Sequence, residues 1–517
     1  MDLKGNKEAI SYPKGGAMKR AFSGSLFTVM GEVIGAVRHI LLIPLFLRAW
    51  GRDVYGEWLA IYALVAYLPL VDIGMHNYVV NSLTQYRSKA DCLSYTKVLH
   101  SALRLYLMIV ILFTLILAAF IYLTPFDKWV NISITAVNEV KAATFLLGMY
   151  ILLSVPGGLV SGLYHSLAEF PRRAILTNIQ QILLLSFLAT VLFLKYNFVV
   201  VALVHFVPFL IILIFTVYDI SHRYPEVNFG FSSGDWRLSL SLLSPGFFFF
   251  FIALSNLLKI QGSILVVSAS IGAAAAAVFS VHRTLANLII KITGAIRNAV
   301  WPEVTVTDAT DNYAKMSLLH NFLMKILLLI STSFAAFLCF TGKDIINLWT
   351  NGRIEFQPVL WMLLVAYLPI NCLWETSGLF QFSTNKHRRF SLCKSSSSML
   401  GIVLCVLLTK IWGIVGTLSG FVIAELAICW IIPLETLRIV KIKRADFLVN
   451  IVAKGALIAG LQVLFGWFAS SYISNIFIRY LVLIIVILAV GLSATYFLWF
   501  TQEERVLTFG LIKRLKR

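Results

Sequence analysis

Charged residues are scarce in this chain, and no long polar stretch interrupts it. Only 13% of its 517 residues are Asp, Glu, Lys or Arg, whereas 59% are hydrophobic and the mean hydropathy is +0.86. This composition excludes a soluble globular protein, and repeated apolar runs of about 20 residues place the chain among polytopic helical membrane proteins. No segment between these runs is long enough for a soluble domain, which excludes a receptor with a large ectodomain. The net charge of +19 does not indicate nucleic-acid binding, because the basic residues form no contiguous polar module.

The sequence also lacks the motifs of redox, metal and catalytic sites. Its six cysteines show neither CxxC nor metal-ligand spacing, which is typical of small core side chains. There is no HExxH, G-x-S-x-G or Walker motif. The longest predicted outside loops, 125–141 and 342–357, are too short for a polymerase or transferase domain. We therefore expect no enzyme activity, no metal and no cofactor, and a membrane-embedded glycan polymerase or transferase is the least supported alternative.

The apolar runs predict an all-α polytopic membrane protein with about fourteen transmembrane helices. Their organisation predicts two six-helix lobes around a central cavity, followed by an additional helix pair. The predicted spans lie near residues 22–47, 54–81, 104–124, 142–168, 175–195, 198–219, 242–268, 272–298, 320–341, 358–383, 392–411, 414–437, 449–470 and 476–500. The predicted parts are a cytoplasmic segment 1–21, an N-lobe 22–219, a C-lobe 242–437, the helix pair 449–500 and a basic cytoplasmic tail 501–517.

The distribution of Lys and Arg between the spans predicts the orientation of the chain. With the N-terminus inside, the inside connections hold 27 of these residues and the outside connections hold nine. Basic residues accumulate on the cytoplasmic side of membrane proteins, so both termini are expected in the cytoplasm. The apolar stretch from residue 22 lacks a small-residue cleavage site and is expected to be an uncleaved first span.

Several spans contain residues that bend or interrupt helices. Proline removes one backbone hydrogen bond and kinks a helix, and in transporters such breaks let helices bend around a central site. Ordinary packing is the alternative, since Gly and Pro are frequent in spanning helices. The interruptions are Pro69, Pro156-Gly157-Gly158, Pro208, Pro245-Gly246 and Pro369.

A faint internal repeat relates the two predicted lobes. Residues 50–58, WGRDVYGEW, align without gaps to residues 271–279, IGAAAAAVF, at an offset of 221. In both places a short glycine-containing outside turn leads into the second helix of a six-helix set. Two similar halves are typical of transporters in which one helix bundle moves against the other.

Five basic side chains lie inside otherwise apolar, membrane-length segments. A charge at bilayer depth costs about 2.5–3.5 kcal/mol on insertion scales, so these groups are expected to face a protein interior or a wet cavity. On the eighth span, three of them fall within an arc of about 120° at about 100° per residue. A cavity lined mainly by cations predicts a ligand that carries negative charge, and guanidinium groups suit phosphate or diphosphate. The five candidates are Arg38, Lys259, Arg283, Lys291 and Arg297.

Carboxylates inside the spans are candidates for ion coupling or for internal ion pairs. Proton or sodium coupling is a common role of intramembrane acids. Alternatively, a carboxylate neutralises a neighbouring cation, for instance Glu32 with Arg38 or Asp72 with Arg297. Such pairing leaves a positive excess on the four spans that open the two lobes. The candidate acids are Glu32, Asp72, Glu375 and Glu425.

Residues 43–87 contain the string WG-x-x-x-YG-x-W, followed by D-x-G at Asp72–Gly74. This stretch resembles bacterial polysaccharide exporters of the Wzx type, which belong to the superfamily of multidrug (MATE) antiporters and the peptidoglycan-precursor flippase MurJ. The resemblance extends through the helix spacing over the first twelve spans. The second half departs from the pattern, with an alanine run at 273–277.

The resemblance implies a flippase in the bacterial inner membrane. Its substrate would be a polyprenyl-diphosphate-linked oligosaccharide, the repeat unit of an O-antigen, capsule or exopolysaccharide, moved from the cytoplasmic to the periplasmic leaflet by alternating access with ion coupling. Arg38, Lys259 and Arg283 would bind the diphosphate, with Lys291 and Arg297 nearer the cytoplasmic entry. The last two spans would form a lipid groove. Membrane lipid and other polysaccharide-assembly proteins are implied partners, and the alternative is a MATE-like cation-coupled drug antiporter.

Overall fold

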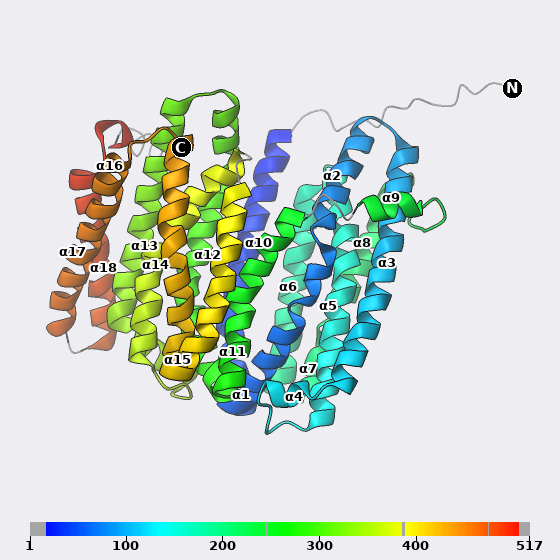
Figure 1. Cartoon of the computed structure of the whole chain (residues 1–517), viewed down its shortest axis with the longest axis horizontal. Helices are drawn as coiled ribbons and strands as arrows, with labels where there is room; N and C mark the ends of the chain where they lie inside the picture. The colour runs from blue at the N-terminus through cyan, green and yellow to red at the C-terminus, as the bar shows by residue number, and fades with distance from the viewer. Residues whose placement is uncertain (1–16, 243–246, 385–387, 474, 506–517) are drawn as a thin grey trace. The chain divides into compact units, whose positions relative to one another are not determined.

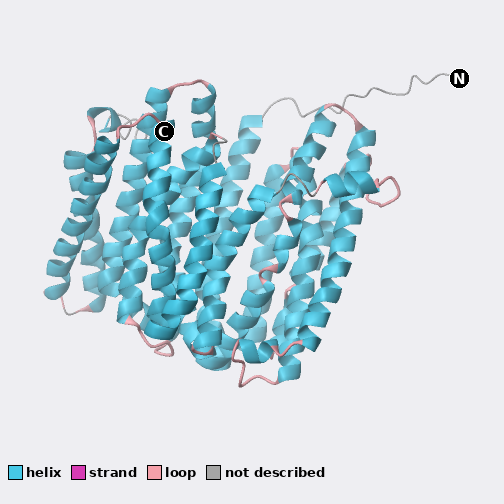
Figure 2. Cartoon of the chain, in the orientation of Figure 1, coloured by secondary structure: helices cyan, strands magenta, loops and turns pink. Residues whose placement is uncertain are grey.

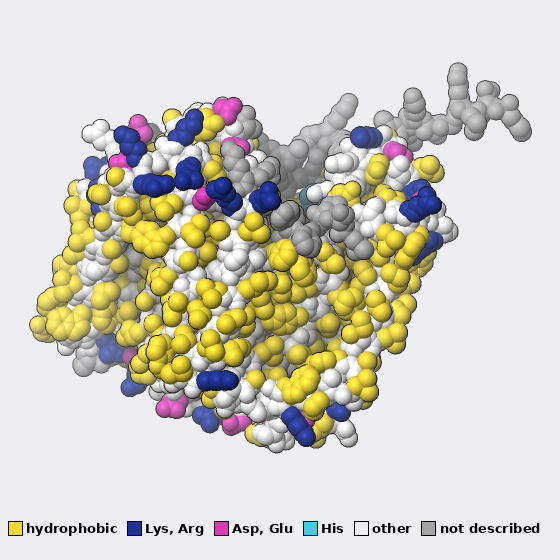
Figure 3. All heavy atoms as spheres, viewed as in Figure 1, with side chains coloured by type: hydrophobic (Ala, Val, Ile, Leu, Met, Phe, Trp, Pro, Cys, Tyr) yellow, Lys and Arg dark blue, Asp and Glu magenta, His cyan; other side chains and the backbone are white. Residues whose placement is uncertain are grey.

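The computed structural model describes residues 17–242, 247–384, 388–473 and 475–505. Within these ranges the regular elements are helices joined by loops, as Figure 2 shows. The predicted interruption at Pro245-Gly246 and most of the predicted terminal segments, 1–21 and 501–517, lie outside the described residues. On the face drawn in Figure 3, hydrophobic side chains cover the middle of the helices and charged side chains lie near their ends. The protein is therefore an all-α chain with the surface of a polytopic membrane protein.

The chain divides into two compact units. The first unit contains Met1–Leu257 and Gly272–Ala274, and the second contains Leu258–Ile271 and Ala275–Arg517. The chain first leaves the first unit at a π-helical turn, Leu258–Gly262. This turn lies between the helices α10, Phe247–Leu257, and α11, Ser263–Ser270. Such turns occur frequently at functional sites.

In the first unit, the long helix α5 contacts α2, α3, α7 and α8, while α1 packs along α6 (Figure 1). A 3₁₀ turn, Leu68–Asp72, separates α1 from α2 at the predicted Pro69 interruption, whereas Pro156 lies inside α5. The elements are α1 Ala17–Val65, α2 Met75–Ser88, α3 Cys92–Leu123, α4 Phe126–Trp129, α5 Val137–Ser166, α6 Phe170–Phe193, α7 Phe198–Val204, α8 Phe206–Arg223, α9 Trp236–Ser241 and α10 Phe247–Leu257.

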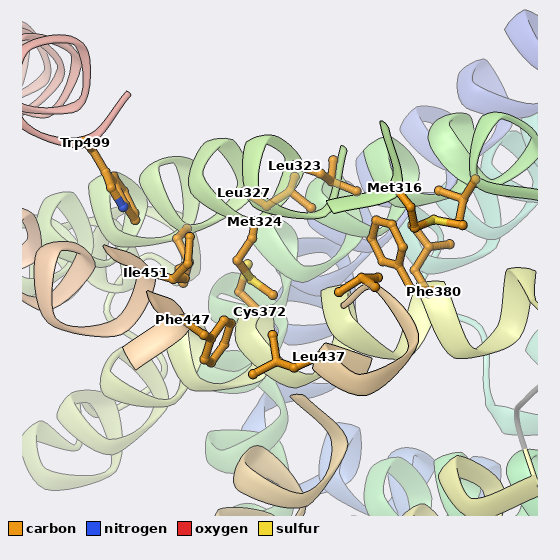
Figure 4. Packing of buried hydrophobic residues seen from close by; sticks show 14 of the residues in the cluster. Met316, Leu323, Met324, Leu327, Cys372, Phe380, Leu437, Phe447, Ile451 and Trp499 are labelled. Atoms are coloured by element: carbon orange, nitrogen blue, oxygen red, sulfur yellow. The ribbon is translucent and has the colours of Figure 1, made fainter. Parts of the chain in front are cut away.

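In the second unit, α14 packs against both α13 and α15, and α17 and α18 pack against α13. Buried side chains of α13, α14, α15 and the last helices form one hydrophobic cluster, which includes Met324, Phe380, Phe447 and Trp499 (Figure 4). The elements are α11 Ser263–Ser270, α12 Ala273–Ala309, α13 Tyr313–Thr350, α14 Pro358–Ser383, α15 Arg388–Ile439, α16 Arg444–Phe447, α17 Lys454–Ser471 and α18 Ile476–Ala494, with π-helical segments at Leu448–Ala453 and Thr495–Trp499.

Helices α1 and α15 are helical hairpins. A straight helix of 49 or 52 residues would be about 75 Å long, far more than the hydrocarbon core of about 30 Å. Each instead reverses at a glycine with positive φ, Gly51 (76°) and Gly413 (58°). In α15 the two arms lie against each other. Thr409 on one arm and Thr417 on the other share a hydrogen bond of 2.7 Å across the reversal.

Twelve helices among the described residues are long and apolar enough to cross a membrane. Two of these twelve segments, Met30–Asp72 and Arg388–Ile439, contain the hairpin reversals and therefore supply two arms each. The chain thus provides about fourteen apolar segments in the predicted order. The short turns that the sequence predicts between the first and second and between the eleventh and twelfth spans are the two hairpin glycines.

The faint repeat aligns two glycines that both have positive φ. Gly51 corresponds to Gly272 at the offset of 221, and both have positive φ, 76° and 127°. Glycine adopts this conformation without the penalty that a Cβ imposes. The repeat thus aligns two glycines at turns that precede long helical segments.

The aromatic residues of the WG-x-x-x-YG-x-W string hold the α1 hairpin closed. Tyr55 stacks on Phe46 with ring centroids 5.2 Å apart, and Trp50 and Trp58 pack on Phe198 at 4.7 and 5.4 Å. The Trp50 indole also donates to the Tyr196 carbonyl at 2.9 Å. These residues are thus explained by packing within the first unit.

Gly56 of the same string permits a close contact between backbones. A Cβ at Gly56 would lie 1.8 Å from the Ala273 carbonyl oxygen, at the start of α12. Next to it, the buried Glu57 carboxylate accepts hydrogen bonds of 2.7–2.9 Å from the backbone N–H groups of residues 133–135. Both positions fix the end of the first unit where α1 reverses.

The C-terminal helix pair is fastened to α13 by a buried ion pair. The Lys325 ammonium donates to Glu504 at 2.7 Å and to the Trp499 carbonyl at 3.0 Å. The side chains of Lys325 and Glu504 are 4% and 2% exposed. Gln462 adds a hydrogen bond of 2.6 Å to Ser333 within the apolar contact. A charged and hydrogen-bonded contact of this kind has one favoured geometry, so α17 and α18 have a defined position on α13.

We predict that Gly56→Ala destabilises the protein by about 1–3 kcal/mol, because the Ala273 backbone must move. Gly460→Ala is the matched control, since no heavy atom lies within 4 Å of its Cβ position in α17, and it should be neutral or slightly stabilising. Thermal unfolding of the purified protein measures both. Equal melting temperatures for the two variants would contradict the close contact at Gly56.

Candidate functional site: buried cations and their counter-ions

The predicted cations lie on α1, on the π-helical turn Leu258–Gly262 and on α12. Arg38 belongs to the first arm of α1 in the first unit. Lys259 lies in the π-helical turn, and Arg283, Lys291 and Arg297 lie on α12, all in the second unit. The structure therefore places four of the five candidates in one unit, where their surroundings are defined.

Lys259 is paired with a carboxylate. Its ammonium lies 2.6 Å from Glu425 of α15 and donates to the Tyr367 hydroxyl of α14 at 2.5 Å. Tyr367 in turn donates to Glu425 and accepts from Asn371 at 2.8 Å. The Lys259 ammonium also lies 5.9 Å from the centroid of the Trp374 ring. A membrane-embedded lysine is thus neutralised by an acid from another helix, which the sequence did not predict.

Arg297 shares a second carboxylate with a lysine. The Glu375 carboxylate lies 3.9 Å from the Arg297 guanidinium and 3.6 Å from the Lys394 ammonium, both beyond hydrogen-bonding distance. Lys394 also lies 5.3 Å from the centroid of the Trp374 ring. Arg297 is only 8% exposed, and its NH1 group has no hydrogen-bond partner among the residues that the structure describes. Within the second unit, the carboxylate nearest to Arg297 in an ion pair is therefore Glu375.

Arg283 is held by neutral groups. Its guanidinium donates to the Ile260 carbonyl at 2.8 Å and to the Ser263 hydroxyl at 2.6 Å. It also lies 5.1 Å from the centroid of the Phe279 ring. In the described parts of the chain, no carboxylate lies within 4 Å of this half-buried group. Arg283 is therefore a positioned cation without an acidic counter-ion.

Arg38 is half-buried and also lacks a carboxylate partner among the described residues. The suggested pair with Glu32 does not form, and Glu32 is exposed on α1. Lys291 is exposed on α12.

Asp72 occupies the break between α1 and α2. It ends the 3₁₀ turn, and the next residue, Ile73, has positive φ. The Tyr106 hydroxyl donates to the Asp72 carboxylate, and the His76 backbone N–H donates to it at 3.2 Å. The acid is thus satisfied by neutral donors rather than by a cation.

Three polar residues that serve these ion pairs recur on one helix. Tyr367, Asn371 and Glu375 are spaced four residues apart on α14, so they share one face of an otherwise apolar helix. This stripe is readable in the sequence, although only Glu375 was among the candidates. Lys394 was missed because it ends a basic connection and was assigned to the loop. In these two neighbouring ion-pair sites, three cations, Lys259, Arg297 and Lys394, face two carboxylates, Glu425 and Glu375.

Comparison with known proteins identifies the fold. No protein-family model matches the chain, and no curated protein matches it. Among solved structures, the lipid II flippase MurJ in an inward closed conformation matches with a TM-score of 0.67 and 16% identity, over 91% of this chain and 97% of that chain. An inward-facing multidrug resistance MATE transporter of the MOP superfamily matches with a TM-score of 0.63 and 15% identity, over 83% and 98%. An outward-facing MATE transporter of the same superfamily gives 0.56 and 14%, over 83% and 97%. The chain therefore has the fold that MurJ and MATE transporters share.

We predict that Lys259→Met destabilises the protein, because Glu425 stays buried without its cation. The expected loss is about 2 kcal/mol or more, below the about 3–5 kcal/mol of fully buried pairs because the Lys259 side chain is 30% exposed. The double variant Lys259→Met/Glu425→Leu should recover most of this loss. Thermal unfolding in lipid nanodiscs measures the coupling, and purely additive effects would show that the two charges do not interact.

Proposed function

We propose that this protein is a flippase for a polyprenyl-diphosphate-linked oligosaccharide, which it moves across the bacterial inner membrane by alternating access coupled to an ion. The observation that carries the proposal is the pair of guanidinium groups, Arg38 and Arg283, that lie in apolar helices without a carboxylate partner among the described residues. An unneutralised charge at that depth is unfavourable in the absence of a ligand. A ligand that brings negative charge removes this penalty.

Guanidinium chemistry favours phosphate over other anions. Arginine offers five N–H donors in a planar fork that matches two oxygens of one phosphate. In Arg283, the Ile260 and Ser263 contacts both use NH1, so they orient the fork while NH2 and Nε remain for a ligand. A diphosphate suits such donors better than a neutral sugar does.

A groove beside the C-terminal helices suits a lipid tail. A cavity of about 420 Å³ lies between α12, α13 and α18, within the size range of about 300–1,000 Å³ that is typical of ligand sites. Apart from one serine, its lining is apolar, which is the chemistry of an isoprenoid or acyl chain. We propose that this cavity acts as the lipid groove that the family resemblance implies. The lining residues are Ile289, Leu329, Ile330, Ser333, Phe334, Phe337, Ile484, Ile487, Leu488 and Leu492.

The alternative, a cation-coupled drug antiporter, has weaker support. MATE transporters share the fold, but a cationic drug requires an unneutralised acid or an open aromatic pocket. In the second unit the two candidate acids, Glu375 and Glu425, are each paired with lysine or arginine. In the first unit the Asp72 carboxylate already accepts hydrogen bonds from the Tyr106 hydroxyl and the His76 N–H. The MurJ match also covers a larger share of the chain than the MATE matches do.

The remaining predicted features complete the proposal. Both termini lie in the cytoplasm, as the basic connections indicate. Asp72, at the break between α1 and α2, is the best-placed candidate for ion coupling, because a change in its charge would act where the helix already bends. Glu32 is a second candidate. Other polysaccharide-assembly proteins are proposed partners in the membrane.

We predict that Arg38→Glu/Arg283→Glu abolishes export of the surface glycan. Loss of two charge-assisted contacts, at about 1.5–3 kcal/mol each, should reduce transport by about a hundredfold or more. Glycan immunoblots measure export, and the quantity of protein in the membrane fraction shows that the variant is inserted.

The matched control is Arg52→Glu/Arg438→Glu, which reverses two exposed arginines and should leave export unchanged. Unchanged surface glycan in a well-inserted Arg38→Glu/Arg283→Glu variant would contradict the proposal. Uptake of a cationic drug by proteoliposomes, without flipping of a lipid-linked glycan, would favour the antiporter.

A further inference from the structure

We propose that Arg297 and Lys394 form a second phosphate-binding subsite in the second unit, in which Glu375 is the resident counter-ion that the diphosphate of the lipid-linked substrate displaces. The subsite rests on the proposed function for the identity of its ligand. The subsite does not include Arg38 or Arg283. Its three members are Arg297 on α12, Glu375 on α14 and Lys394 on α15.

The first observation is that the carboxylate satisfies neither cation. Glu375 lies 3.6 Å from Lys394 and 3.9 Å from Arg297, whereas charge-assisted hydrogen bonds are about 2.7–2.9 Å long. For comparison, Lys259, Lys325 and Arg479 of the second unit each lie much closer to a carboxylate, with nitrogen–oxygen distances of 2.5–2.7 Å. The Glu375 site is therefore loosely filled, and the other buried pairs are not.

The second observation is an unused donor inside the protein. Arg297 is more than nine-tenths buried, and its NH1 atom has no hydrogen-bond partner among the described residues. A buried N–H without an acceptor is rare and unfavourable, because water is lost and nothing replaces it. The group therefore points to an acceptor that binds from outside the chain.

The third observation is the charge balance. Two cations share one carboxylate, which leaves one net positive charge at the subsite. The neighbouring Lys259–Glu425 pair is neutral and does not change this balance. A diphosphate carries more negative charge and more acceptor oxygens than a carboxylate, so it can bond to both cations at hydrogen-bonding distance.

Exposure indicates how a ligand would enter. The Glu375 side chain is 27% exposed, whereas the side chains of Arg297 and Lys394 are 9% and 13% exposed. The carboxylate is thus the most exposed of the three side chains. Trp374 and Phe390 hold the Lys394 ammonium from the sides, at 5.3 and 5.6 Å from their ring centroids. In the proposed exchange, a ligand replaces the Glu375 carboxylate as the counter-ion of the two cations.

Isothermal titration of the full chain in neutral-lipid nanodiscs tests the subsite, with inorganic pyrophosphate and farnesyl diphosphate as probes. Arg297→Gln and Lys394→Gln should each weaken binding by about tenfold, the effect of one charge-assisted hydrogen bond. Glu375→Gln removes the competing charge and should strengthen binding by about tenfold. Because a poorly folded protein does not bind more tightly, this gain distinguishes the subsite from a purely structural ion-pair network.

The control variants are Arg389→Gln and Glu435→Gln, which neutralise an ion pair within α15 whose arginine is 69% exposed, and they should not change the affinity. Tighter binding of farnesyl diphosphate than of pyrophosphate, with the same dependence on Arg297, supports a lipid-linked ligand. Equal affinities for the two probes would overturn the lipid-linked assignment. Affinities that do not change with Arg297→Gln, Lys394→Gln or Glu375→Gln would overturn the subsite. If glycan export survives reversal of Arg38 and Arg283 while Glu375→Gln still tightens binding, the flippase proposal fails and the subsite stands.

Discussion

The unfavourable free energy of a charge in an apolar bilayer determines how this structure is organised. Every basic residue that lies in a membrane-length helix must be neutralised, hydrogen-bonded or reserved for an anionic ligand. The described residues show the first two solutions, and we propose the third. Lys259 and Lys325 are neutralised by tight pairs with Glu425 and Glu504, and Arg283 is held by neutral oxygens. Arg297 lies 3.9 Å from the Glu375 carboxylate, which also interacts with Lys394.

These solutions divide the embedded cations by role. The tight pairs connect helices that are far apart in the sequence, so they stabilise the second unit and fasten the C-terminal helix pair. The cations that lack a tight partner carry unused hydrogen-bond donors, which is the property that a phosphate ligand requires. Function is therefore assigned by the geometry of each cation's partner rather than by the presence of a charge in a span.

The sequence predicted the helical architecture well because hydrophobic length and turn chemistry are local properties. The reversals at Gly51 and Gly413 fall where the sequence predicts short turns, and the helix breaks at Pro69. The offset of 221 aligned Gly51 with Gly272, and both have positive φ. The sequence also proposed five cations and four acids as site residues. It could not pair them, since helical periodicity gives a residue's angle on its own helix but not which helix lies opposite. Glu425 beside Lys259 and Lys394 beside Glu375 are contacts of that kind.

If embedded cations bind the phosphate groups of a lipid-linked substrate, the protein should distinguish a diphosphate-linked lipid from a neutral one. The most direct measurement is flipping in proteoliposomes of two fluorescent glycolipids that carry the same sugar and the same isoprenoid, one joined through a diphosphate and one through a neutral ether. Fluorescence quenching by an impermeant reductant reports the fraction that changes leaflet. We predict that the protein flips the diphosphate-linked lipid, and that the ether-linked lipid changes leaflet only at the background rate. Equal rates for the two lipids would contradict it.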